Sequence, residues 1–245
     1  ARLYEMKRLL KDTGSIYVHL DWHASHYVKV EMDKIFGVDN FRNELVWSYG
    51  NSATKSKKSF PTKHNIIFWY SKTNTYTYNE QLTKPARSLE EKFNYIDEKG
   101  NRYYLINKKL PDGTIEKVKR YPPNPEGLAP VNSVWQIPYL QNNAKEKIGY
   151  PTQKPETLLA RIIQASTNEG DIVADFFCGG GTTLAVAQHF NRRWIGIDNS
   201  QLAISTMKKR FNEMQRPVPY KIFINNSENE NITKTTGIII TNEYL

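Results

Sequence analysis

A glycine-rich turn between a strand and a helix constrains the fold of this chain more than any other feature. The segment DFFCGGGTT, residues 175–183, follows a β-branched apolar run and precedes a helical pattern. Consecutive glycines let the backbone approach a ligand closely, and the next helix offers unpaired N–H groups to an anion. Asp198 ends the following predicted strand, 19 residues after Gly179, as expected of a carboxylate that accepts hydrogen bonds from ribose hydroxyls. Together these features indicate a site for an adenosine-containing cofactor.

The same turn disfavours a dinucleotide cofactor. A dinucleotide fingerprint has a third glycine three residues after the second, and Leu184 occupies that position. An NAD-dependent dehydrogenase is therefore a poor alternative. A turn that only connects a strand to a helix is the other alternative, but the helix start at Thr182 and the position of Asp198 favour a ligand.

The order of predicted elements indicates an α/β fold. In the C-terminal half, predicted strands cover 171–176 and 194–198, and predicted helices cover 155–166, 182–190 and 200–212. This alternation implies a Rossmann-like, doubly wound and mostly parallel sheet. The N-terminal part repeats the pattern, with helices near 3–10 and 23–36 and strands at 16–20, 43–49 and 65–70.

Two stretches fall outside this pattern. Residues 77–132 are rich in proline and charge, and the dipeptide Asp112-Gly113 predicts a turn between short strands. We therefore expect an inserted module there, with the main domain formed by 1–76 and 133–225. Residues 226–245 are rich in Asn, Glu and Thr and are expected to form a tail.

The composition favours a polyanionic partner. Lys and Arg number 34 against 25 Asp and Glu, a net charge of +9, which attracts nucleic acid. Cys178 is the single cysteine, and the first residues have no signal-peptide core, so a cytoplasmic location is expected. The apolar runs are strand-sized, which predicts no membrane span. Five histidines without a metal-binding spacing predict no metal.

The motifs resemble those of the amino-group DNA methyltransferases of the β arrangement, which use S-adenosylmethionine (AdoMet). The family's AdoMet motif, roughly Asp-x-Phe-x-Gly-x-Gly-Thr, matches residues 175–182, and the segment at 150–159 resembles the motif that lines the methionine end of the cofactor. In this resemblance Lys154 offers an ammonium donor to the methionine carboxylate. The resemblance assigns cofactor binding to Asp175, Phe177, Cys178, Gly179, Gly181, Thr182, Asp198, Thr152, Gln153 and Lys154.

The resemblance covers most of residues 3–215 and implies a circularly permuted class I methyltransferase fold with a target-recognition module at 77–132. It implies methyl transfer to N6 of adenine in double-stranded DNA, by an enzyme of the restriction-modification or the solitary type. Methylation of N4 of cytosine and a non-catalytic DNA-binding relative stay open as alternatives. So do a homodimer and a cognate restriction endonuclease as partners.

The family's catalytic tetrapeptide, Asp/Asn/Ser-Pro-Pro-aromatic, has no match in the 245 residues. The only Pro-Pro pair lies in Tyr121-Pro122-Pro123-Asn124, inside the insert, and is predicted to be a loop. We therefore expect the catalytic residues upstream of Ala1 and a catalytic domain that is incomplete at its N-terminus. The chain alone is expected to be inactive and of low stability, because an absent central strand leaves two sheet edges unpaired.

Contacts to DNA are predicted mainly in residues 50–64. This segment has no acidic residue, and its Lys55, Lys57, Lys58 and Lys63 are candidates for phosphate contacts. Trp47 is a candidate for stacking on an extruded base, with a half-buried strand tryptophan as the alternative. His19 and Asp21 end a predicted strand and are candidates for lining the pocket, with capping of the next helix as their alternative.

Overall fold

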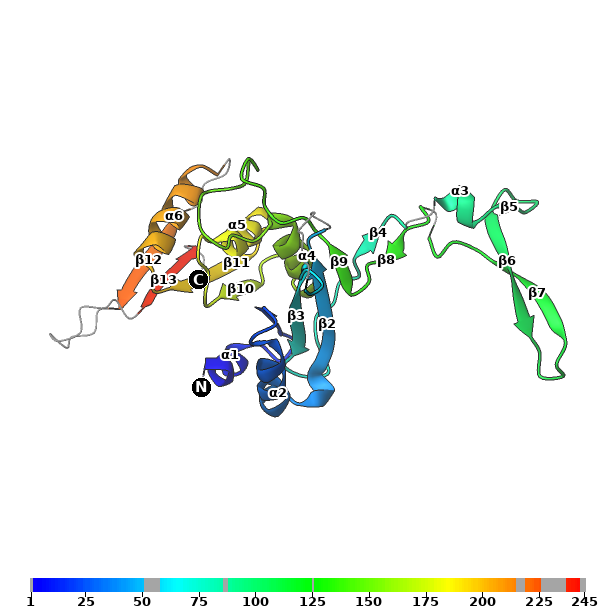
Figure 1. Cartoon of the computed structure of the whole chain (residues 1–245), viewed down its shortest axis with the longest axis horizontal. Coiled ribbons are helices and arrows are strands. Elements are labelled where there is room, and N and C mark those ends of the chain that lie inside the picture. Colours follow the sequence, from blue (N-terminus) through cyan, green and yellow to red (C-terminus); the bar gives the residue numbers. More distant parts are fainter. Residues whose placement is uncertain are drawn as a thin grey trace. The chain divides into compact units, whose positions relative to one another are not determined.

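The computed structural model describes residues 2–50, 58–85, 88–124, 126–214, 219–225 and 237–242. The chain divides into two compact units (Figure 1). We call Glu80–Asn132 the insert unit, and Ala1–Asn79 with Ser133–Leu245 the main unit. The insert was expected to begin at residue 77, three residues earlier. Its assignment to target recognition stays a prediction.

The first sheet of the main unit has the strand order β1-β3-β2-β9. Its strands are β1 (Ser15–Leu20), β2 (Phe41–Ser48), β3 (His64–Ser71) and β9 (Val134–Gln136). β3 is antiparallel to both β1 and β2, whereas β9 is parallel to β2.

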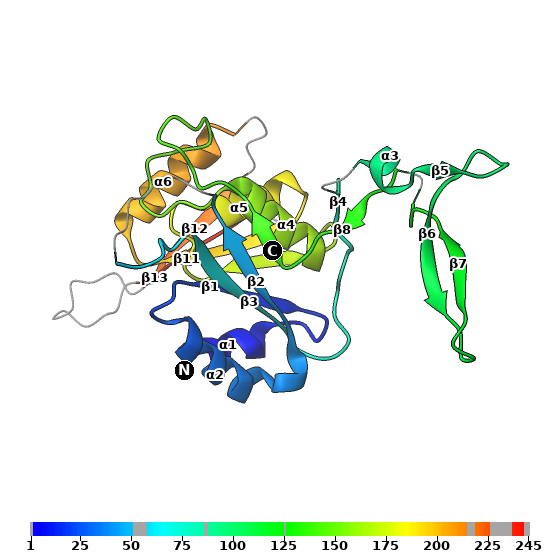
Figure 2. The ribbon, with the colours of Figure 1, turned by 45° about the vertical axis from the view of Figure 1, so that its right-hand side comes forward.

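Two helices pack beside this sheet, α1 (Arg2–Leu9) and α2 (Ser25–Phe36), and the short helix η1 (Val38–Asn40) connects α2 to β2 (Figure 2). The spacing of Met32, Ile35 and Phe36 puts all three on one side of α2. There they form a buried cluster with Phe68 and Tyr70 of β3.

The second sheet has the order β10-β11-β13-β12. Its strands are β10 (Ile172–Asp175), β11 (Arg193–Asp198), β12 (Tyr220–Asn225) and β13 (Gly237–Asn242), accompanied by α4 (Glu156–Ser166), α5 (Thr182–His189) and α6 (Gln201–Asn212). Trp194 of β11 stacks on Phe211 of α6 with ring centroids 4.8 Å apart, and Leu184 of α5 is fully buried in the same core. None of the helices in the described part of the chain is long and apolar enough to cross a membrane.

The α/β class is confirmed, but the strand directions differ from the expectation. In these two sheets only β10–β11 and β2–β9 are parallel, and the other four described pairs are antiparallel. Within the described residues β1 pairs only with β3, and β10 only with β11. Each is therefore an edge strand. Tyr17 of β1 reaches Ser166 at the end of α4, with 2.7 Å between the two hydroxyl oxygens.

The expectation of a tail from residue 226 onward is wrong for residues 237–242. They form β13, which lies between β11 and β12 and is antiparallel to both. The run of three isoleucines at 238–240 is a strand signal. The polar composition of the preceding residues obscured it.

The described residues of the insert unit form short strands and one short helix. Its strands are β4 (Leu82–Thr83), β5 (Tyr95–Ile96), β6 (Arg102–Lys109), β7 (Ile115–Arg120) and β8 (Ala129–Pro130), and its helix is α3 (Leu89–Lys92). β4 pairs with β8, whereas β5, β6 and β7 form an antiparallel sheet. The predicted turn at Asp112-Gly113 joins β6 to β7, with Gly113 at a φ of +87°. The predicted loop at Pro122-Pro123 follows β7 without regular structure.

Candidate cofactor-binding site

The turn between β10 and α5, residues 176–181, is here called the glycine loop. Gly179 and Gly181 have φ angles of +50° and +73°, which side chains with a Cβ rarely adopt. A Cβ at Gly179 would lie 2.8 Å from Cε1 of Tyr150, and one at Gly181 would lie 2.6 Å from Cγ of Met207. Both positions therefore require glycine. α5 begins directly afterwards, at Thr182, and its N-terminal N–H groups favour an anion.

Asp198, at the end of β11, ties the glycine loop to the neighbouring strand. Its Oδ2 accepts a hydrogen bond of 2.8 Å from the N–H of Gly179, and its Oδ1 accepts one of 2.9 Å from the N–H of Ser200. A carboxylate has about four acceptor positions, so both oxygens keep capacity for a further donor. The structure thus brings the predicted ribose acceptor directly against the predicted loop.

Asp175 ends β10 and lies beneath the loop. Its Oδ2 accepts a 2.6 Å hydrogen bond from the hydroxyl of Thr183, and its Oδ1 accepts one of 3.1 Å from the N–H of Phe177. Burial raises the pKa of this carboxyl group, and these two hydrogen bonds oppose the shift. Asp175 therefore connects the start of the loop to the first turn of α5.

The two loop residues Phe177 and Cys178 differ in what they offer a ligand. Phe177 is 63% exposed, so its ring is accessible. Cys178 is buried, with its N–H donating to the carbonyl of Ile197 and its Sγ 3.6 Å from the sulfur of Met207. Burial also raises the pKa of the Cys178 thiol. Its side chain is therefore a packing group, and its carbonyl already accepts from the N–H of Gly181, so a contact of Cys178 with the cofactor stays a prediction.

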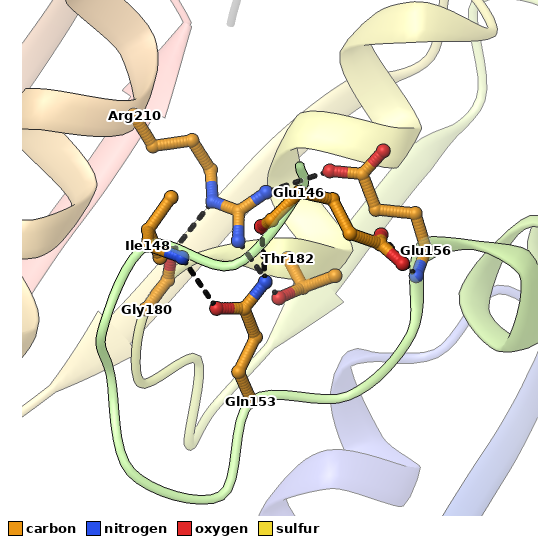
Figure 3. A network of polar contacts seen from close by, with 7 residues as sticks. All are labelled: Glu146, Ile148, Gln153, Glu156, Gly180, Thr182 and Arg210. Carbon is orange, nitrogen blue, oxygen red and sulfur yellow. Dashed lines mark hydrogen bonds and ion pairs between the residues drawn. The ribbon is translucent and has the colours of Figure 1, made fainter. Parts of the chain in front are cut away.

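In the segment before α4, the side chain of Gln153 holds the chain in a loop (Figure 3). Oε1 of Gln153 accepts a 3.0 Å hydrogen bond from the N–H of Ile148, and its Nε2 donates one of 2.7 Å to the carbonyl of Glu146. The amide of Gln153 thus supports the loop that carries Tyr150. Thr152, an exposed residue with the left-handed φ of +62°, precedes it. A cofactor contact by either side chain stays a prediction.

Arg210 of α6 was not among the predicted site residues, yet it binds the loop from the other side (Figure 3). Its Nε donates to the carbonyl of Gly180 at 3.0 Å, and one terminal nitrogen donates to the hydroxyl of Thr182 at 3.2 Å. The other terminal nitrogen pairs with Glu156 at 2.8 Å, and the Arg210 side chain is only 6% exposed. Its position three residues after the buried Met207 places it on the inner side of α6. That spacing was the available sequence signal.

Lys154 is a half-buried cation close to the ends of both edge strands. Burial lowers its pKa, and the charge of Asp175, at the end of β10, raises it. Nζ of Lys154 donates to the carbonyl of Thr152 at 2.8 Å. His19 of β1 has a pKa lowered to about 4, first by burial and then by the charge of Lys154. The predicted carboxylate-binding lysine thus acts electrostatically on groups from both sheets.

His19 is neutral near pH 7, and its Nε2 is buried without a hydrogen-bond partner among the described residues. It fits the pocket-lining prediction better than Asp21, which accepts from the backbone and ring nitrogens of His23 at 3.1 Å each. Asp21 thus closes a turn with His23 before α2, whose N-cap has no side-chain hydrogen bond. In the part of the chain that the structure describes, no group of three or more His, Cys, Asp and Glu side chains is placed to hold a metal ion.

The candidates for contacts to DNA differ in their exposure. Trp47 is only 4% exposed, and its Nε1 donates to the carbonyl of Ile137 at 2.8 Å. A base needs an exposed ring face, so this placement supports the packing alternative over base stacking. Lys58 is exposed, and Lys63, just before β3, is half-buried. Lys55 and Lys57 lie outside the described residues.

Replacing Arg210 with methionine should lower the free energy of unfolding by roughly 2 kcal/mol, because the Gly180 carbonyl and the Thr182 hydroxyl lose a buried donor. Urea denaturation measures the change. Lys209→Met removes the exposed cation beside it on α6 and should cost less than about 0.5 kcal/mol. Equal losses in the two variants would contradict the role assigned to Arg210.

His19 should make the protein less stable at mildly acidic pH. Its folded-state pKa of about 4 lies below the ordinary value of 6.5, so between these values the unfolded chain binds a proton that the folded chain does not. The stability that neutral His19 contributes is complete above pH 6.5 and falls as pH decreases towards 4. His19→Gln should reduce the difference in unfolding free energy between about pH 7.5 and about pH 5. His64→Gln, at an exposed position, is the control, and an unchanged difference in His19→Gln would refute the prediction.

Comparison with known proteins supports the resemblance. M.EcaI, a type II methyltransferase of Enterobacter cloacae, is 31% identical over 252 residues, covering 86% of this chain and 56% of that protein. The DNA adenine methyltransferase YhdJ of Escherichia coli strain K12 is 33% identical over 196 residues, covering 79% of this chain and 59% of that protein. This chain therefore spans less than two thirds of the length of either relative.

The crystal structure of the M1.HpyAVI-SAM complex has a TM-score of 0.53 to this chain at 21% identity, over 86% of this chain and 82% of that one. This likeness shows a shared fold and so confirms the class I methyltransferase architecture. The sequence profile of the N6/N4 DNA methylases matches residues 1–209. The chain therefore belongs to the N6/N4 DNA methylase family.

Proposed function

We propose that this protein transfers a methyl group from AdoMet to N6 of adenine in double-stranded DNA, and that the present chain supplies the cofactor site and contacts to the DNA. The observation that carries the proposal is the glycine loop bound by Asp198, in a chain of the DNA methylase family. Adenine is supported by the 33% identity to the adenine methyltransferase of Escherichia coli. N4 of cytosine is the second candidate, because the family includes both kinds of enzyme.

The residues of the site fit AdoMet. Gly179 and Gly181 have positive φ angles and crowded positions, so the loop presents backbone groups rather than side chains to a ligand at these two residues. Asp198 keeps acceptor capacity for ribose hydroxyls, and Phe177 offers an accessible ring. When bound, AdoMet supplies an electrophilic methyl group for in-line attack by an exocyclic amino nitrogen.

Lys154 suits the methionine carboxylate of the cofactor. Removing an ammonium group from water is costly unless the group is paired, and burial already lowers the pKa of Lys154. Its Nζ uses one donor on the Thr152 carbonyl, and an ammonium group has three. A carboxylate within hydrogen-bond distance would offset the cost of burial, so we expect the pKa of Lys154 to rise when the cofactor binds.

Duplex DNA is the partner that the charge favours. Lys55, Lys57, Lys58 and Lys63 lie in a stretch without acidic residues, suited to phosphate contacts. Phe60, in the same stretch, is 99% exposed and offers a ring to a base. The same proposal includes a cytoplasmic location, and a homodimer and a cognate restriction endonuclease as partners.

Calorimetric titration with AdoMet tests the cofactor site. We expect micromolar binding by the 245-residue chain, weakened about tenfold by Asp198→Ala, which corresponds to about 1.4 kcal/mol. The variant loses the ribose acceptor and the bond to Gly179. Asp39→Ala removes an exposed carboxylate from η1 and should bind AdoMet normally. A folded chain that gives no heat with AdoMet would refute the cofactor assignment.

Product analysis tests the target base. A longer protein that joins this chain to an Asp/Asn/Ser-Pro-Pro-aromatic tetrapeptide should convert labelled AdoMet and duplex DNA into N6-methyladenine, identified by chromatography of the hydrolysed DNA. The chain alone should give no product, because its 245 residues lack that tetrapeptide. N4-methylcytosine would establish the second candidate instead. DNA binding without methylation by the longer protein would indicate a non-catalytic relative.

A further inference from the structure

The insert unit contains a two-stranded antiparallel ribbon, formed by β6 and β7 (Figure 2). Six residue pairs form its ladder, from Tyr104 opposite Arg120 to Lys109 opposite Ile115. The turn at Asp112-Gly113 closes its tip, where Oδ1 of Asp112 accepts from the N–H and the hydroxyl of Thr114. The ribbon is therefore a regular element with a defined register.

Alternation along each strand gives the ribbon two different faces. The face that we call the basic face carries Leu105, Asn107, Lys109, Ile115, Lys117 and Lys119, and all six are exposed. It has three lysines, one amide and no carboxylate. The opposite face carries Tyr104, Ile106, Lys108, Glu116, Val118 and Arg120, so its charges are mixed.

The opposite face is the one that packs within the insert unit. Phe93, which follows α3 and is only 4% exposed, lies with its ring 5.3 Å from that of Tyr104. Nζ of Lys92 lies 5.4 Å from the Phe93 ring, and Ile106 and Val118 are half-buried. The insert unit thus partly covers the opposite face of the ribbon and leaves every residue of the basic face exposed.

Tyrosines extend the basic face at the base of the ribbon. Tyr103 precedes Leu105 on the same face, and its ring stacks on Tyr95 of β5 at a centroid distance of 5.5 Å. Nζ of Lys119 lies 4.7 Å from the centroid of the Tyr103 ring. The aromatic ring thus positions the ammonium group of Lys119, a residue that stays exposed on the basic face.

We propose that the basic face of this ribbon binds in the major groove of duplex DNA, an inference that rests on the proposed function and deepens it. The major groove is about 12 Å wide and admits a two-stranded ribbon. Asn107 and Lys117 lie directly opposite each other at the middle of the ladder. An asparagine amide matches the N6 and N7 edge of adenine, and a lysine matches O6 and N7 of guanine. Lys109 and Lys119 flank this pair and reach the phosphates.

Two double variants with the same change of charge test the inference. Lys117→Gln with Lys119→Gln alters the basic face, and Lys108→Gln with Arg120→Gln alters the opposite face. Fluorescence anisotropy with a labelled duplex of mixed sequence, at several salt concentrations, gives the affinity and its salt dependence. The basic-face variant should bind about tenfold more weakly, with a log–log salt slope smaller by about 0.9 for each phosphate that the variant no longer neutralises. The opposite-face variant should stay within about twofold of the unmodified chain, with circular dichroism confirming that both are folded.

The choice of groove has its own test. Netropsin, which fills the minor groove, should leave binding unchanged. A duplex with glucosylated hydroxymethylcytosine, whose sugars fill the major groove, should bind the unmodified chain as weakly as the basic-face variant binds ordinary duplex. The reverse pattern would overturn the major-groove assignment.

AdoMet titration of the same proteins separates this inference from the proposed function. Both double variants should bind AdoMet like the unmodified chain. Normal AdoMet binding with equal loss of DNA affinity in the two variants would overturn the ribbon inference alone, and so would failure of the unmodified chain to bind duplex DNA. A selective loss in the basic-face variant without any AdoMet binding would leave the ribbon inference standing and refute the cofactor site.

Discussion

Two hydrogen bonds to the backbone of the glycine loop determine the geometry of the candidate site. Asp198 accepts from the N–H of Gly179, and Arg210 donates to the carbonyl of Gly180. These partners belong to β11 and α6, so the second sheet and its outer helix together define the shape of a loop that starts at β10. Since a Cβ at Gly179 would meet Tyr150, the loop before α4 limits it as well. The site is therefore a property of the packed second half of the main unit.

The two edge strands bring charge to the same neighbourhood. Lys154 acts electrostatically on His19 from β1 and on Asp175 from β10. All three groups have shifted pKa values because burial penalises their charged forms, and such clusters are common at functional sites. Neutral His19, whose Nε2 has no hydrogen-bond partner among the described residues, offers a polar atom to a ligand in this neighbourhood. The ends of the two edge strands therefore carry ionisable groups close to the candidate cofactor site.

The insert unit separates its charges in a way that composition does not reveal. Its carboxylates lie mainly in residues 80–98, whereas six of its Lys and Arg lie on the ribbon strands, residues 102–120. The alternation of side chains along the strands places these cations on two faces. Because the opposite face packs against Phe93, only the basic face is fully exposed. The proposed division between a scaffold that binds the cofactor and a separate element that contacts DNA agrees with the rule that functions are added to a common fold.

The sequence by itself determined the α/β class, most element positions, the glycine loop and the family, because periodic burial and turn chemistry are local and can be read along the chain. It did not reveal β13, whose isoleucines follow a long polar stretch, or the buried state of Trp47. Only the tertiary structure decided the role of Arg210, whose partners Gly180 and Glu156 lie 30 and 54 residues away. Such contacts depend on how helices pack on a sheet, and a one-dimensional pattern does not encode that packing.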